Sequence, residues 1–182
     1  MTRVLVPLAQ GCEELEAITI TDLLVRAGFD VTTASLDNQL VTASRGTIIK
    51  PGTDLDTALQ QSYDIIVLPG GLPGADHLNN DPRIHEIIQT MHQAGNYIAA
   101  ICAAPKVLAH AGILKGKRAT AYPGTLEKLG LKDITISKEA IVRDDNIITS
   151  RGPGTAMDFA LTLIEILADT ATKESVEAGL TR

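Results

Sequence analysis

Residues 98–106 read Ile98-Ala99-Ala100-Ile101-Cys102-Ala103-Ala104-Pro105-Lys106, and this stretch decides the fold of the chain. The apolar run 97–101 is short and predicts a strand buried on both faces. A helix is predicted over 103–111. Its first turn contains Pro105, where a missing N–H removes no helical hydrogen bond. Cys102 is therefore expected at a sharp junction between a strand and a helix.

Cys102 is the first candidate for a reactive group. Ala100 and Ala104 stand two residues to either side of it, which is the small-x-nucleophile-x-small spacing of a nucleophile elbow. A helix N-terminus presents free N–H groups and a partial positive charge, so we expect it to favour thiolate over thiol. The alternative is a structural cysteine, because free Cys is among the most buried residue types.

Composition limits the class of protein. The 182 residues are 45% hydrophobic, which predicts one domain, 1–182, with a sizeable core. No apolar run approaches the ~18 residues of a membrane helix, and the N-terminus lacks the layout of a signal peptide, so we expect a cytoplasmic protein. Cys12 and Cys102 form no C-x-x-C motif, which argues against a disulfide framework or a metal site. A net charge of −6 with no Trp argues against nucleic-acid binding.

Strands and helices alternate along the chain, which predicts an α/β fold: a doubly wound, mainly parallel sheet with helices on both faces. The carboxyl ends of parallel strands share one crevice, so Gly11, Gly70 and Cys102 should converge there. The predicted strands are 3–8, 30–35, 64–68, 97–101, 118–122, 134–137, 140–143 and 147–150, with a hairpin over 40–50. The predicted helices are 13–27, a short one opened by 53–56, 82–94, 103–111, a turn at 126–129, and 156–168.

Two further groups could act beside Cys102. Three acids, Glu13, Glu14 and Glu16, crowd the first turn of the first helix. The helix dipole alone explains acids at this place, but Glu16 adjoins a core position and is the one we expect to face the crevice, with a raised pKa. The backbone of Gly70-Gly71 could donate N–H groups to an oxyanion, or it could form only a tight turn.

Histidine offers no visible catalytic base. The four residues are His77, His85, His92 and His110, and none directly follows a late strand. The sequence therefore does not indicate a catalytic Cys–His pair of the peptidase or amidotransferase kind.

Four ordered motifs together resemble the ThiJ/PfpI superfamily, in the branch of the Parkinsonism-associated protein deglycase and YajL. They are Gly11-Cys12-Glu13-Glu14-Leu15-Glu16, Val67-Leu68-Pro69-Gly70-Gly71, Ala99-Ala100-Ile101-Cys102-Ala103-Ala104-Pro105 and Ser150-Arg151-Gly152-Pro153-Gly154-Thr155. The resemblance implies a flavodoxin-like domain, similar to class I glutamine amidotransferases. It also implies a homodimer whose reactive Cys102 is easily oxidised to sulfinate.

Site roles also follow from the resemblance. Glu16 takes the place of a protonated glutamate that hydrogen-bonds the cysteine, and Gly70, Gly71 and Ala103 match the backbone donors around it. Arg26, Arg45 and Ser150 resemble an adjacent anion-binding group. The resemblance implies that Arg45 reaches in from the partner subunit. Without the resemblance, Arg45 would be a turn residue and Arg26 a solvated helix end.

Two functions remain open at this point. In the first, Cys102 attacks methylglyoxal or glyoxal, free or as an early adduct on a protein or nucleotide, Glu16 moves protons, and lactate or glycolate leaves without a metal or organic cofactor. In the second, the protein is a redox sensor or redox-regulated chaperone in which oxidation of Cys102 is the functional event. Some relatives carry a histidine where this chain has Tyr122, so peptidase or glutaminase activity is not expected.

Overall fold

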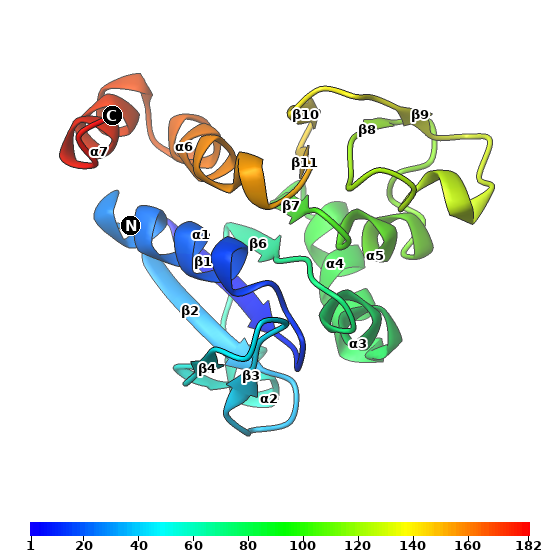
Figure 1. The fold of residues 1–182 in the computed structure, drawn as a ribbon, viewed down its shortest axis with the longest axis horizontal. Helices are drawn as coiled ribbons and strands as arrows, with labels where there is room; N and C mark the ends of the chain where they lie inside the picture. The colour runs from blue at the N-terminus through cyan, green and yellow to red at the C-terminus, as the bar shows by residue number, and fades with distance from the viewer.

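A seven-stranded sheet forms the centre of the computed structural model, which describes residues 1–182 (Figure 1). Its strand order is β10-β11-β7-β6-β1-β2-β5, and every neighbouring pair is parallel except β10 with β11. The mainly parallel, doubly wound sheet predicted from the sequence is confirmed. The strands are β1 (Arg3–Leu8), β2 (Asp30–Ser35), β5 (Thr53–Asp54), β6 (Ile65–Leu68), β7 (Tyr97–Ile101), β10 (Ile141–Asp144) and β11 (Ile147–Ser150).

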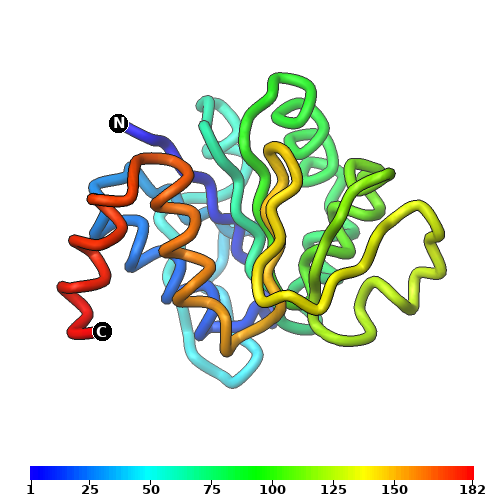
Figure 2. The backbone as a smooth tube through the Cα atoms, turned by 90° about the horizontal axis from the view of Figure 1, so that it is seen from above, coloured from blue at the N-terminus to red at the C-terminus, as the bar shows by residue number.

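Helices cover both faces of this sheet (Figures 1 and 2). Alternate residues of the central strands point to opposite faces, as the period of a strand requires: Val67 joins the core beneath α1 and α6, and Leu68 the core beneath α4 and α5. The helices are α1 (Glu14–Arg26), α2 (Leu55–Ala58), α3 (Gly74–Asn80), α4 (Pro82–Gln93), α5 (Pro105–His110), α6 (Ala156–Leu167) and α7 (Thr170–Gly179). Short 3-10 turns occur at Glu127–Leu129 and Pro153–Thr155.

The order in which strands are added to the sheet reverses between the parallel neighbours β1 and β6, and this switch point creates the crevice. From β1 the chain passes outward to β2, and from β6 it passes the other way to β7. The loops that leave β1 and β6 therefore diverge at the carboxyl ends of the strands, which is where open α/β sheets bind ligands. Gly11, Gly70 and Cys102 follow β1, β6 and β7 at this edge.

The predicted strand 118–122 is wrong in length. Only β8 (Arg118–Ala119) is extended, and it pairs with β9 (Thr135–Ile136) in a separate two-stranded sheet. The rest of the segment leaves the ladder because its amides are bound elsewhere: Thr120 N donates to Thr149 Oγ1 and Tyr122 N donates to Cys102 O. The predicted hairpin is confirmed as β3 (Val41–Thr42) paired with β4 (Ile48–Ile49).

Three helices differ from the predictions: α5 begins later than expected, and α3 and α7 were not expected. α5 begins at Pro105 because residues 102–104 form the turn itself. The helices α3 and α7 are additional; α7 is mostly polar and starts where the Asp169 carboxylate accepts the N–H of Thr172. The short helix α2 is capped by Asp54, which accepts from Thr57 N. None of the helices combines the length and the apolar character that crossing a membrane would take.

Candidate active site

Cys102 occupies the first position after β7, in a left-handed backbone conformation with φ +63°. This conformation is unfavourable for a residue with a Cβ, and hydrogen bonds on both sides hold it there. The amide of Cys102 donates to Ser150 O over 3.0 Å, and its carbonyl accepts from Tyr122 N over 2.8 Å. The neighbouring strand β11 and the segment after β8 thus fix the turn that presents the thiol, and Cys102 as a residue is 8% exposed.

Glu16 is the acid that the structure brings to Cys102. It lies in the first turn of α1 and is fully buried. Its Oε2 accepts the backbone N–H of Gly70 over 2.7 Å. Its Oε1 is also buried, and no N–H or O–H group of the chain donates to it. Because Oε2 already accepts a proton donor, a proton on this carboxyl group would lie on Oε1.

Glu13 and Glu14 face a different part of the chain. Both accept the hydroxyl of Ser44, at 2.9 and 3.1 Å. Glu14 also accepts the N–H groups of Arg45 and Thr47. Desolvation opposes ionisation, but the surrounding N–H donors outweigh it and lower the pKa of Glu14 to about 2. These two acids hold the β3–β4 turn, which leaves Glu16 as the acid of the crevice.

The loop after β6 approaches Cys102 so closely that only glycine fits. A Cβ on Gly70 would lie 2.7 Å from Cys102 Cβ and 2.8 Å from Glu16 Oε2. A Cβ on Gly71, whose φ is +88°, would lie 2.3 Å from Glu13 N. The glycines are therefore required by close packing as well as by turn geometry.

Two backbone N–H groups act on the Cys102 thiol. Those of Gly71 and Ala103 lower the pKa of the Cys102 thiol, and neither donates to a backbone carbonyl. Of the three donors expected around Cys102, Gly70 takes another role, because its N–H is engaged by Glu16. The arrangement leaves two amides for a negative charge that develops at or beside the sulfur.

Burial determines the ionisation of both side chains. Desolvation raises the pKa of Glu16 to about 7, opposed by the Gly70 amide and the Cys102 thiol. Desolvation, with the charge of Glu16 and its hydrogen bond, raises the pKa of Cys102 to about 12. The raised pKa expected of Glu16 is present. The expectation that the helix N-terminus would favour the thiolate is wrong in direction, since burial and the acid outweigh the Gly71 and Ala103 amides.

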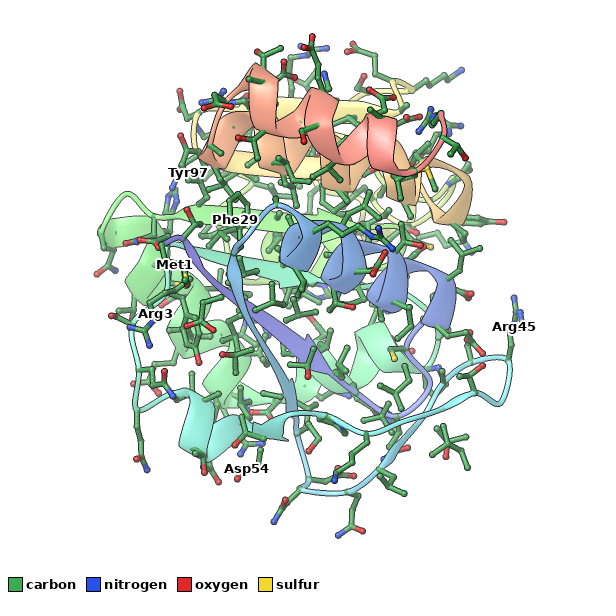
Figure 3. The ribbon with its side chains drawn as sticks, turned by 90° about the vertical axis from the view of Figure 1, so that its left-hand side faces the viewer. Met1, Arg3, Phe29, Arg45, Asp54 and Tyr97 are labelled. Carbon is green, nitrogen blue, oxygen red and sulfur yellow. The ribbon has the colours of Figure 1, made fainter.

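The proposed anion-binding residues do not gather around Cys102 within one chain. Ser150 is adjacent through its carbonyl, but its hydroxyl donates to Ala140 O and contacts Thr155 Oγ1. Arg26 pairs with Asp22 at the far end of α1, ten residues and therefore about 15 Å of helix rise from Glu16. The side chain of Arg45 projects away from the molecule at the β3–β4 turn (Figure 3).

The second cysteine differs from the first. Cys12 is fully buried, and burial together with the charge of Glu14 raises its pKa to about 12. Its surroundings are those of a packed turn residue. No three His, Cys, Asp or Glu side chains gather in a way that could hold a metal ion.

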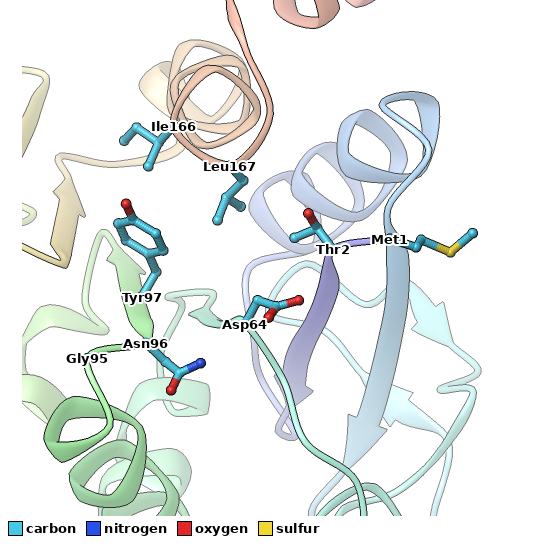
Figure 4. Close-up of a pocket in the computed structure, with 8 residues that line it drawn as sticks. All are labelled: Met1, Thr2, Asp64, Gly95, Asn96, Tyr97, Ile166 and Leu167. Carbon is cyan, nitrogen blue, oxygen red and sulfur yellow. The ribbon is translucent and has the colours of Figure 1, made fainter.

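Two cavities bear on the location of the site. A cavity of about 470 Å³ lies at the amino ends of β1, β6 and β7, between Thr2, Asp64 and Leu167 (Figure 4). This is the edge of the sheet opposite to Cys102, and no cysteine lines the cavity. A second cavity of about 360 Å³ is bordered by Ala103 and Tyr122, the residue after Cys102 and the residue that donates to its carbonyl.

Sequence reasoning did not assign a structural role to two residues at this site. The first is Tyr122, whose amide bonds the carbonyl of Cys102 and whose ring contacts Gly152. The second is Lys106, on the first turn of α5, which lines the cavity beside Cys102. The sequence could have indicated Lys106, because it lies four residues after Cys102, in the first turn of the helix that begins beside the cysteine.

Comparisons with known proteins match nearly the whole chain. The sequence profile of the DJ-1/PfpI family matches residues 2–166. Protein dj-1beta of Drosophila melanogaster is 41% identical over 177 residues, covering 97% of this chain and 95% of that protein. Its crystal structure matches with a TM-score of 0.95 and 40% identity, over 99% of this chain and 97% of that one.

Two further relatives carry informative names. The structure of oxidized Toxoplasma gondii DJ-1 matches with a TM-score of 0.94 and 37% identity, covering all of this chain and 98% of that one. A Caenorhabditis elegans protein named Glutathione-independent glyoxalase DJR-1.2 is 37% identical over 158 residues, which are 87% of this chain and 84% of that protein.

Proposed function

The chain belongs to the DJ-1/PfpI family, and from this membership and the geometry around Cys102 we propose that it is a cysteine-dependent hydrolase of the glyoxalase or deglycase type. Its substrates are methylglyoxal, glyoxal and their early adducts on proteins or nucleotides, and its role is defence against carbonyl and oxidative stress. The family membership and the glyoxalase name of one relative support this class. One observation carries the proposal: the backbone of Gly70 lies against both Cys102 and the buried carboxyl group of Glu16, which accepts its N–H.

Glu16 supplies the proton transfer that the thiol requires. An isolated thiol with a pKa of about 12 would be ionised to only about one part in 10⁵ at pH 7. A carboxyl group with a pKa of about 7 is near the optimum for accepting and returning a proton at neutral pH. We therefore assign Glu16 as the base that takes the thiol proton while sulfur attacks.

The reaction balances without a cofactor. A C–S bond forms between Cys102 and the aldehyde carbon, and the proton taken by Glu16 passes to the aldehyde oxygen to give a hemithioacetal. A proton then moves from the first to the second carbon of methylglyoxal, through an enediol, to give a lactoyl thioester. Water cleaves the C–S bond and releases lactate and the thiol. Where the substrate is an adduct, the departing thiol or amine leaves with a proton as the new C–S bond forms.

The amides of Gly71 and Ala103 serve the charge that develops during these steps. They are the backbone donors that lower the pKa of Cys102, so they favour negative charge close to the sulfur. In other enzymes, each positioned donor of this kind stabilises the transition state by about 3 kcal/mol. The rate acceleration therefore comes from substrate positioning and from these donors, because the raised pKa of Cys102 leaves little thiolate at neutral pH.

A homodimer is part of the proposal. Three apolar residues on the outer face of α1 are about half exposed, and their spacing places them on one stripe: Leu15, Ile18 and Val25. An exposed apolar stripe of this kind is typical of a contact surface. In such a dimer Arg45, which projects away from its own chain, would reach the crevice of a partner and form the anion-binding group with Ser150 there. Arg26, about 15 Å of helix rise from Glu16 of its own chain, would join this group only from the partner. The cytoplasmic location expected from the sequence stays a prediction.

A redox sensor or redox-regulated chaperone is the second candidate. The observation that favours it is the difference between the two thiols: Cys102 is slightly exposed, and Cys12 is sealed. Oxidation would then convert Cys102 alone to the sulfinate, a second acid beside Glu16.

One comparison tests the first candidate against the second. Wild-type protein, Cys102→Ser and Glu16→Gln are assayed for lactate from methylglyoxal, with N-acetylcysteine as the free-thiol control. Lactate formation by wild type above the thiol control, lost in both variants, supports the enzyme. Turnover no better than the thiol control, together with a gain of about 32 Da on Cys102 in dilute peroxide, supports the sensor.

A further inference from the structure

The cavity beside Cys102 carries an excess of positive charge. Two lysines line it, Lys106 and Lys128, and no acid does. This is notable in a chain whose net charge is −6. We infer that the cavity binds the anionic group of an adduct substrate, so that the enzyme acts on methylglyoxal or glyoxal adducts of small molecules that carry a carboxylate or a phosphate. The inference rests on the proposed function and specifies its substrate class.

Cavity size argues for a substrate larger than the free aldehyde. The volume is about 360 Å³, which corresponds to roughly twelve water molecules at ~30 Å³ each. Pockets for small-molecule ligands begin at about 300 Å³. Methylglyoxal bound at Cys102 would leave most of this space empty, whereas the amino-acid or nucleotide part of an adduct could fill it.

The two lysines differ in how freely their charge is available. Lys106 is largely buried, with 15% of its side chain exposed, and it pairs with Asp76, which is half exposed. Lys128 is exposed and forms no ion pair. Glu127, the neighbour of Lys128 in the chain, does not line the cavity, and its carboxylate accepts the N–H of Gly124 over 2.9 Å. Lys128 therefore offers the cavity a cation that no ion pair holds, and Lys106 adds to the same local field.

The rest of the lining suits the uncharged part of such a substrate. Leu72 and Tyr122 expose more than half of their surfaces, and both border the cavity, as Leu129 does. Two lining residues place the cavity next to Cys102: Ala103 follows it in the chain, and the amide of Tyr122 binds its carbonyl. Figure 1 shows the segment after β8 beside α5, the helix that carries Lys106. A substrate attached to Cys102 can thus extend over apolar side chains toward the lysines.

The test compares matched pairs of substrates. The methylglyoxal adduct of N-acetylcysteine carries a carboxylate, and that of N-acetylcysteine amide does not. The glyoxal adducts of guanosine monophosphate and guanosine form the corresponding phosphate pair. We expect kcat/KM to be about 1.5- to 5-fold higher for the charged member of at least one pair, the range that partly exposed ion pairs give. The pair that shows the preference identifies carboxylate or phosphate as the anion.

Variants assign the preference to the cavity. Lys128→Gln is expected to reduce the ratio of kcat/KM within that pair toward one, and Lys128→Arg to retain it. Lys50→Gln removes the same charge from an exposed residue outside the cavity and should leave the ratio unchanged. Equal kcat/KM within both pairs, or a ratio that survives Lys128→Gln, would overturn the inference.

A binding measurement separates this inference from the proposed function. In Cys102→Ser, the stable thioether S-acetonyl-N-acetylcysteine and its amide are titrated by calorimetry. A tighter Kd for the acid, lost in Cys102→Ser/Lys128→Gln, supports the anion site even if wild type forms no lactate, in which case only the proposed reaction fails. Equal Kd values contradict the anion site for the carboxylate, and equal values for guanosine monophosphate and guanosine contradict it for the phosphate.

Discussion

Gly70 donates its backbone N–H to Oε2 of Glu16 over 2.7 Å. This bond joins the loop after β6 to the first turn of α1, two elements whose residues are 54 positions apart. It also determines which oxygen of Glu16 can carry the proton, because Oε2 is already an acceptor. The chemistry of the site therefore depends on a residue that has no side chain.

Gly70→Ala should disrupt the site directly. The new Cβ would lie 2.7 Å from Cys102 Cβ, 2.8 Å from Glu16 Oε2 and 2.8 Å from Ile101 O. Ile101 O belongs to the backbone and Cys102 Cβ is bonded to it, and Glu16 Oε2 ends a side chain that is fully buried. We expect the free energy of unfolding in urea to fall by about 1–3 kcal/mol, with loss of turnover. Gly154→Ala is the matched control, since its Cβ would meet no atom within 4 Å. A fully stable and active Gly70→Ala would show that the loop adapts.

Glu16 should make stability depend on pH. Its pKa is raised from 4.5 to about 7 in the folded protein, so the folded state holds the proton more tightly than the unfolded state. The stabilisation is complete below pH 4.5 and is lost as the pH rises through about 7. This difference is worth roughly 3 kcal/mol. Urea denaturation between pH 4.5 and 8 should show this loss in wild type relative to Glu16→Gln; parallel curves would contradict it.

Glu16→Gln should separate the reactivity of the thiol from turnover. The charge of Glu16 and its hydrogen bond raise the pKa of Cys102, so their removal should lower that pKa. We expect faster alkylation of Cys102 by iodoacetamide at pH 8–9 and, at the same time, slower lactate formation, because the proton acceptor is lost. If alkylation slows as well, Glu16 stabilises the thiolate in wild type by donating its proton.

The two cysteines should differ in accessibility. Cys102 is 8% exposed and Cys12 is not exposed. In the folded protein, iodoacetamide or dilute peroxide should therefore modify the peptide that contains Cys102 at least ten times faster, and mass spectrometry of the digested protein measures this ratio. After unfolding in urea the two rates should converge. Equal rates in the folded state would mean that the turn around Cys12 opens.

The apolar stripe on α1 should mediate association. Ile18 is 48% exposed, so Ile18→Glu is expected to leave the chain folded while sedimentation equilibrium shifts from dimer toward monomer. Ile136→Glu, at an apolar residue of β9 that is 37% exposed, is the matched control and should sediment as wild type does. A monomeric wild type, or a dimer unaffected by Ile18→Glu, would contradict this assignment.

The sheet could be predicted from the sequence for a simple reason. Parallel strands covered on both faces consist of continuous apolar residues, and β6 and β7 are buried along almost their full length. The elbow was equally accessible, because a small residue, a cysteine and Pro105 fix a turn by local geometry. α3 and α7 escaped prediction because neither has a marked apolar stripe: α7 buries only Val176.

Ionisation at the site could be predicted only in part. The raised pKa of Glu16 follows from an acid beside a core position, which the helical period reveals. The raised pKa of Cys102 does not, because it depends on burial and on the distance to Glu16 across the fold. The role of Gly70 was hidden for the same reason: nothing local distinguishes an amide that binds Glu16 from one that faces the sulfur.

The left-handed backbone of Cys102, with φ +63°, implies a tension between folding and chemistry at one residue. Such a conformation disfavours any side chain by about 1–2 kcal/mol, and glycine, despite its larger entropy in the unfolded chain of about 0.5–1 kcal/mol, would adopt it freely. Selection for a durable fold alone would thus replace this cysteine with glycine. The strain at Cys102 is therefore explained by the chemistry of the sulfur and not by the stability of the fold.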